Sequence, residues 1–94
     1  MTTVASPAKA GTSKKAAVSC THSFVRDSTY NRPGRRSTCT GLANTTTWLL
    51  TIRCRNYPMN TDYDWSRSRK GNGTITVYCN SPVDELYYWY YDIL

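Results

Sequence analysis

Apolar and polar residues alternate in several stretches of the chain, and this alternation is typical of β-strands with one buried face. The clearest stretch is 46–54, and the pattern recurs at 16–24 and 74–79. The apolar face of the clearest stretch carries Trp48, Leu50, Ile52 and Cys54. Because successive side chains of a strand point to opposite sides, each of these stretches places a cysteine on its apolar face. A bridge between Cys54 and Cys79 would therefore lie inside the core if the stretches 46–54 and 74–79 face one another.

Two further strands are predicted from weaker patterns. Residues 37–42 form a short strand that carries Cys39, and the aromatic segment 86–91 has the composition of a strand. Ser-Pro-Val-Asp at 81–84 has the order of residues that begins a helix, so a helix is the alternative for the C-terminal segment. Aromatic residues on both faces favour the strand, in a sheet whose outer surface is also covered or used.

Turn residues separate the predicted strands. Asn-Arg-Pro-Gly at 31–34 predicts a tight reversal, and Lys-Gly-Asn-Gly at 70–73 predicts a turn just before a strand. The long polar segment 56–70 is interpreted as a loop that carries aromatic residues for recognition. The alternative is that Tyr63 and Trp65 begin a further strand and pack inward.

These patterns predict an all-β fold, a small β-sandwich of about five to seven short antiparallel strands over residues 16–94. Residues 1–15 consist almost entirely of Ala, Ser, Thr, Gly, Pro and Lys. Such a composition buries too little apolar surface to fold alone. We therefore predict a flexible basic arm at 1–15, either a linker or a segment that adds a strand to a partner's sheet.

Cysteine usage indicates the compartment. The 94 residues contain four cysteines but no Cys-x-x-Cys pair, and His22 is the single histidine, so a zinc site has few candidate ligands. Disulfides are the better interpretation, because a chain this small needs cross-links to supplement its core. Disulfides form in oxidising compartments, so we predict a secreted, extracellular protein without a metal. The disulfide residues are Cys20, Cys39, Cys54 and Cys79.

The net charge of +6 is unevenly distributed. Residues 21–60 contain six arginines against the single acid Asp27, whereas residues 81–94 contain acids and no base. A basic surface favours an anionic partner, although the same charge also serves solubility alone. The oxidising compartment argues against nucleic acid, and no stretch has the length of a membrane span. We expect another secreted or cell-surface protein with an acidic surface as the partner.

Residues for catalysis are scarce. His22 falls on the apolar face of a predicted strand and is interpreted as a structural histidine. Asp62 and Asp64 share one face of an extended chain, but acids at this spacing are common on solvated loops. Gly71-Asn72-Gly73 lacks the helix that completes a phosphate site. We therefore predict a binding protein that is not an enzyme and needs no cofactor.

The predicted partner-binding surface combines two loops. Arginine and aromatic residues gather around the turn at 31–34, and the same residue types recur in the segment 56–70. Arginine, tryptophan and tyrosine are the residue types that most often anchor interfaces. The candidate binding residues are Arg26, Tyr30, Arg32, Arg35, Arg36, Tyr63, Trp65 and Arg67.

The segments Thr47–Cys54 and Gly71–Cys79 resemble a tryptophan-strand-cysteine and glycine-threonine-strand-cysteine pattern of small secreted actinobacterial proteins. The cysteine layout from Cys20 onward is similar to that of the tendamistat-like α-amylase inhibitors. This resemblance implies a six-stranded β-sandwich with sequential bridges, Cys20 to Cys39 and Cys54 to Cys79.

That inhibitor family presents a Trp-Arg-Tyr triplet between its first two cysteines, and this chain has Arg26 and Tyr30 there but no tryptophan. The resemblance therefore implies the fold and the bridges, and not amylase inhibition. The expected function is that of an inhibitor of a secreted enzyme or an adaptor in a secreted toxin assembly. The alternative is a cationic antimicrobial or antifungal protein that acts on a competitor's cell envelope.

Overall fold

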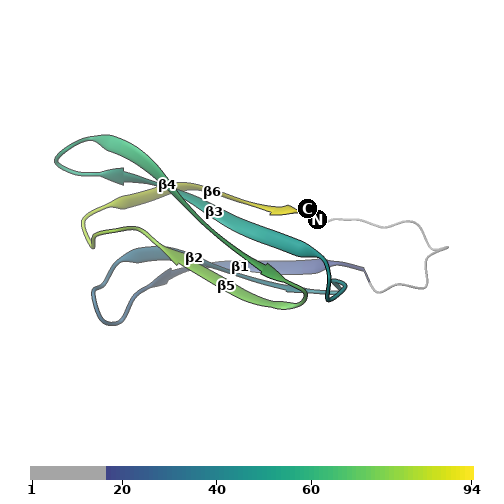
Figure 1. Cartoon of the computed structure of the whole chain (residues 1–94). Coiled ribbons are helices and arrows are strands. Elements are labelled where there is room, and N and C mark those ends of the chain that lie inside the picture. Colours follow the sequence, from purple (N-terminus) through teal and green to yellow (C-terminus); the bar gives the residue numbers. More distant parts are fainter. Residues whose placement is uncertain (1–16) are drawn as a thin grey trace.

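The computed structural model describes residues 17–94 and forms two antiparallel sheets of three strands each (Figure 1). The described residues contain no helix, so the predicted all-β sandwich is confirmed. The predicted arm at 1–15 lies outside the described residues. The strands are β1 (Ser19–Arg26), β2 (Pro33–Thr40), β3 (Thr47–Asn56), β4 (Thr61–Lys70), β5 (Gly73–Tyr78) and β6 (Glu85–Ile93).

One sheet has the order β1-β2-β5 and the other the order β4-β3-β6, and the core lies between them. The central strand β3 supplies the largest side chains of this core, because its alternation turns Trp48, Leu50 and Ile52 inward, where they are fully buried. Ile75 and Val77 of β5 face them from the other sheet. The alternation seen in the sequence is therefore the inside-outside pattern of a sandwich.

Two disulfides close the structure with the predicted pairing. Cys54 of β3 is bonded to Cys79, just after β5, so this bridge crosses the core between the two sheets. Cys20 is bonded to Cys39, and these residues are direct partners in the pairing of β1 with β2. The bridge that strand alternation suggested for β3 and β5 is confirmed, and so is the second bridge, which the resemblance implied.

The interpretation of 56–70 as a loop is wrong. Only residues 57–60 form a turn, and β4 then pairs with β3 along its whole length. Most side chains of β4 are polar because it is an exposed edge strand. Its outward side chains pair with those of β3 in solvent. Asp64 and Asp62 bind Arg53 and Arg55 there. The alternative, a further strand that includes Tyr63 and Trp65, is confirmed, but only Tyr63 packs inward as that alternative predicted, because Trp65 remains exposed.

The reversal predicted at 31–34 is displaced. The chain turns at residues 28–30, and Pro33 and Gly34 are already buried at the start of β2. The structural reason lies across the sheet, where Gly34 is the direct partner of Tyr78. A Cβ atom at Gly34 would collide with the Tyr78 ring and would lie 2.6 Å from the carbonyl oxygen of Val77. Glycine is needed here for close packing and not for a turn.

The C-terminal segment is a strand, as predicted. The Ser81 hydroxyl accepts a hydrogen bond from the Val83 amide at 3.3 Å in a turn that does not continue into a helix. β6 then pairs with β3 through a register irregularity at Arg53 and Cys54. Because of this bulge, Tyr87 and Tyr88 both lie on the outer side of the sheet, beside Arg55 and Arg53.

Candidate functional site

A groove of about 330 Å³ opens along the flank where β4 and β5 meet. These strands are consecutive in the chain but form the edges of different sheets, so no third strand covers the space between them. Side chains from β4, from β5, from the segment before β2 and from the segment after β5 line the groove. They are Arg32, Trp65, Ser66, Arg67, Thr76, Val77, Tyr78 and Asn80.

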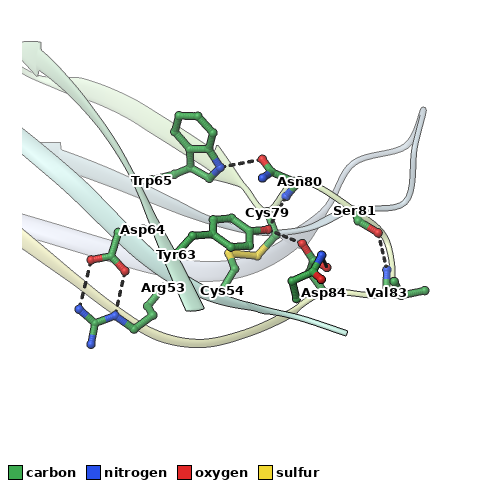
Figure 2. The surroundings of a disulfide bond; sticks show 11 residues. Arg53, Cys54, Tyr63, Asp64, Trp65, Cys79, Asn80, Ser81, Val83 and Asp84 are labelled. Carbon is green, nitrogen blue, oxygen red and sulfur yellow. Dashed lines mark hydrogen bonds and ion pairs between the residues drawn. A yellow bond between two sulfur atoms is a disulfide. The ribbon is translucent and has the colours of Figure 1, made fainter. Parts of the chain in front are cut away.

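Trp65 is one of the residues that line this groove. It pairs across the sheet with buried Ile52, but β4 is an edge strand, so 48% of the tryptophan remains exposed. The indole Nε1 donates a hydrogen bond of 2.7 Å to Asn80 Oδ1, as Figure 2 shows. The ring is therefore held in one orientation while part of it stays open to solvent.

Asn80 is itself held from behind by Tyr63. The backbone N–H of Asn80 donates to the Tyr63 hydroxyl at 2.7 Å, and this hydroxyl donates to the carboxylate of buried Asp84 (Figure 2). Burial raises the pKa of the Tyr63 phenol to about 12, and the hydrogen bond to Asp84 acts in the same direction. Tyr63 therefore stays protonated at neutral pH. Its hydroxyl supports the series of hydrogen bonds that runs through Asn80 to Trp65.

Arg32 forms the other wall. Its Nε donates to Asp27 Oδ2 at 2.8 Å, and its guanidinium lies 5.4 Å from the centre of the Tyr78 ring and 5.2 Å from that of Tyr30. Hydrogen bonding from the Thr29 amide, and then from Arg32, holds the pKa of Asp27 below its ordinary value. The carboxylate is therefore ionised at neutral pH and keeps the guanidinium in place against the rings.

The β4 and β5 flank carries positive charge in excess. Arg67 has no carboxylate partner within residues 17–94, and the same holds for Arg36 and Arg69. Arg36 Nε donates to the hydroxyl of Thr76, a groove residue, at 3.4 Å, and Arg69 donates to a carbonyl of β5. Since the charge of Arg32 is matched by Asp27, the net positive charge of the flank comes from these three arginines.

The structure brings three of the candidate binding residues to one groove, namely Arg32, Trp65 and Arg67. Arg36 adjoins the groove through its bond to Thr76. Tyr30 is exposed on the turn beside Arg32, with 65% of its surface accessible. Residues from the two predicted segments therefore meet, although one segment is a turn and the other a strand.

Three other candidates have different placements. Tyr63 is half-buried and acts as the support described above. Arg26 lies at the end of β1, the far edge of its sheet, and donates to the carbonyl of Asn31 at 2.6 Å. The placement of Arg35 in an exposed loop is wrong, because it lies in β2 with its side chain on the inner face.

Arg35 alternates with Ser37 and Cys39, which are both buried, so strand periodicity turns it inward. Its guanidinium lies 4.2 Å from the centre of the Trp89 ring. Burial lowers the pKa of this guanidinium. Arg35 therefore fills the flank between β2 and β6 rather than adding charge to the groove.

The contribution of β5 and of the residue Asn80 after it to the groove was not predicted from the sequence. Tyr78, Thr76 and Asn80 line the groove, and none was a candidate. The signal was present in the alternation of residues 74–79, which placed Tyr78 and Thr76 opposite the apolar face. What the pattern lacked was the neighbour of this strand across the flank, because sheet order depends on contacts between distant segments.

His22 packs among residues of the inner faces of the two sheets. Its Nδ1 lies 2.7 Å from the hydroxyl of Ser37, and its ring centre lies 4.5 Å from that of Trp89 and 4.7 Å from that of Tyr91. Burial and the charge of Arg35 lower its pKa. Both carboxylates of the pair Asp62 and Asp64 are engaged by arginines.

Among residues 17–94, no three His, Cys, Asp or Glu side chains gather closely enough to hold a metal ion. No helix in this part of the chain is long and apolar enough to cross a membrane. Comparisons with protein families, with characterised proteins and with solved structures find no match for this chain. The tendamistat-like resemblance stays a prediction.

Proposed function

We propose that this chain is a secreted, non-catalytic binding protein that docks on an acidic surface of another secreted or cell-surface protein. The observation that carries the proposal is the groove, in which Trp65, Arg67 and Arg32 meet from distant parts of the sequence. The function is that of an inhibitor of a secreted enzyme or an adaptor in a secreted toxin assembly.

The residue types and their fixed positions support this proposal. Tryptophan, tyrosine and arginine are the residues whose truncation most often costs binding energy. Trp65 and Arg32 are each held by a hydrogen bond to a neighbour, so little side-chain freedom is lost when a partner arrives. Unpaired Arg67 supplies charge that speeds association with an acidic surface.

Secretion is supported by the two disulfides in a small all-β domain, which are consistent with an extracellular protein. In a reducing compartment both bridges would be opened, and the thin core would lose their stabilisation.

The test is affinity capture from the culture medium of the producing organism with three versions of the protein. The groove variant combines Trp65→Ala and Arg67→Glu. The matched control combines Phe24→Ala and Arg26→Glu, because Phe24 and Arg26 are an exposed aromatic-arginine pair on β1, at the opposite flank. Circular dichroism and thermal melting establish that each version is folded.

We expect the wild type and the control to retain one stoichiometric protein that the groove variant loses. Retention of that protein by the groove variant would contradict the proposal, and so would its loss from the control. Killing of test bacteria or fungi by the pure protein alone would instead support the antimicrobial alternative.

A further inference from the structure

The outer face of the β4-β3-β6 sheet carries a row of exposed tyrosines. Tyr87, Tyr88 and Tyr90 of β6 are 42%, 51% and 43% exposed. Regular alternation would turn neighbours such as Tyr87 and Tyr88 to opposite sides, but the bulge in the pairing of β6 with β3 brings both to the outer face. The centres of the Tyr88 and Tyr90 rings are 6.0 Å apart. The result is a group of exposed tyrosine rings along β6.

Paired charges lie beside these tyrosine rings. Arg53 donates to both carboxylate oxygens of Asp64 at 2.8 and 3.1 Å. Arg55 does the same to Asp62 at 2.9 and 3.4 Å. Hydrogen bonding from these guanidinium groups holds the pKa of each aspartate below its ordinary value. Both pairs therefore remain ionised and intact at neutral pH.

The charged row also holds the rings. The guanidinium of Arg53 lies 5.8 Å from the centre of the Tyr88 ring, and that of Arg55 lies 5.0 Å from the centre of the Tyr87 ring. The Tyr87 hydroxyl donates to Asp62 at 2.6 Å. Exposed pairs of this kind add little to folding stability. Their clear effect is to order a surface, which lowers the entropy lost on binding.

The chemistry of this face selects its ligand. Each of its two guanidinium groups is matched by a carboxylate, so the centre of the face has no net charge to attract an anion. Its side chains are polar or aromatic, with Leu49 as the aliphatic exception on the outer side of β3. The interior of a protein-protein interface is more apolar than this. Hydroxyl groups suit the donors and acceptors, and the C–H face of a sugar ring suits a tyrosine ring.

We propose that this tyrosine face binds an uncharged polysaccharide chain that runs along β6. Tyr88 and Tyr90 stack against sugar rings, and the exposed edges of the Arg53–Asp64 and Arg55–Asp62 pairs bind hydroxyl groups. The role is distinct from that of the groove, because the tyrosine face is neutral and lies on another surface. A protein with both surfaces would be held at a glycan-rich cell wall while its groove engages a partner.

The test measures retention of the full chain on microcrystalline cellulose, chitin and starch granules. The variant combines Tyr88→Ala and Tyr90→Ala, and the matched control is Phe24→Ala, an exposed aromatic residue on β1 in the other sheet. We expect at least one of the polysaccharides to retain the wild type and the control. The loss of both rings should weaken this binding by about tenfold. Added salt should leave the binding unchanged, because the face has no net charge at its centre.

A second measurement needs no variant and covers the case in which the double variant does not fold. Titration of the labelled wild type with the soluble fragment of the retaining polysaccharide should shift the amide resonances of β6. The groove resonances of Trp65 and Arg67 should stay in place.

Three outcomes would overturn the proposal. The first is no retention on any of the three polysaccharides, and the second is equal retention of the tyrosine variant. The third is dimerisation in analytical ultracentrifugation that Tyr88→Ala abolishes, which would make the face a contact between two copies of this chain. None of these outcomes bears on the groove, whose partner is tested separately.

Discussion

Gly34 illustrates how a single atom decides packing in this fold. Its hydrogen atom lies under the Tyr78 ring, and any larger side chain would meet that ring and the backbone of Val77. Because backbone cannot yield easily, we predict that Gly34→Ala lowers the free energy of unfolding by about 1 to 3 kcal/mol. Urea denaturation measures the change. Ser23→Ala, exposed on the outer face of the same sheet, should have almost no effect, and an equally small effect of Gly34→Ala would contradict the packing described.

From the surroundings of His22 we predict that the stability of the fold depends on pH. Burial, and then the charge of Arg35, lower the folded pKa of His22 below the ordinary value of 6.5. The folded chain therefore binds fewer protons than the unfolded chain, and acid favours unfolding. The contribution of His22 to stability should be constant above about pH 6.5. It should fall as the pH drops from about 6.5 toward the pKa of His22 in the folded chain.

The measurement is the melting temperature of the wild type and of His22→Gln between about pH 7 and about pH 5. The variant should lose the decline over this range. The aspartates with lowered pKa act in a separate window, because their stabilisation is lost only below their ordinary value of 3.8. An identical decline in both proteins would show that His22 is not the titrating group.

At the scale of elements, the two disulfides should differ in importance. They close loops of similar length, with sequence separations of 19 and 25, so loop entropy assigns each a similar contribution of about 3 kcal/mol. The bridge from Cys54 to Cys79 is fully buried and joins the sheets, whereas Cys20 and Cys39 are already paired in neighbouring strands. Replacing the buried bridge leaves a cavity in the core.

We therefore predict that Cys54→Ala with Cys79→Ala costs more stability than Cys20→Ala with Cys39→Ala. Urea denaturation of both double variants under non-reducing conditions gives the comparison. Equal losses would mean that only loop closure matters. Peptide mapping that links Cys20 to Cys79 would contradict the pairing itself.

The strands differ in how far the sequence predicts them. In β3 and β5, buried apolar residues alternate with mostly polar residues on the outer face, so their alternation is clear in the sequence. β4 escaped recognition because it is exposed on nearly all positions, and the pairing that makes it a strand involves residues of β3. The prediction that Arg35 lies in an exposed loop was wrong for a related reason. Charge suggested a solvent-exposed loop, while its position two residues before Ser37 turned it inward onto Trp89.

At the scale of the whole molecule, the sandwich carries two different kinds of surface, one along a flank and one on the outer face of a sheet. The flank between β4 and β5 gathers unpaired arginines around Trp65, whereas the outer face of the β4-β3-β6 sheet matches its central arginines with aspartates. Residue types predicted that arginine and tryptophan would take part in recognition. The sequence could not predict that Arg32 and Trp65 line the same groove, because this depends on which edges of the two sheets adjoin.

The groove is tested most directly by titrating isotope-labelled protein with a poly-glutamate peptide and following its NMR resonances. The peptide stands in for an acidic partner surface. We predict shifts of the Trp65 indole N–H and of the amides of Arg67, Tyr78 and Asn80, and their loss at high salt. Unchanged groove resonances, with shifts confined to β6 or to the Phe24 and Arg26 flank, would contradict the assignment of the groove as the binding site.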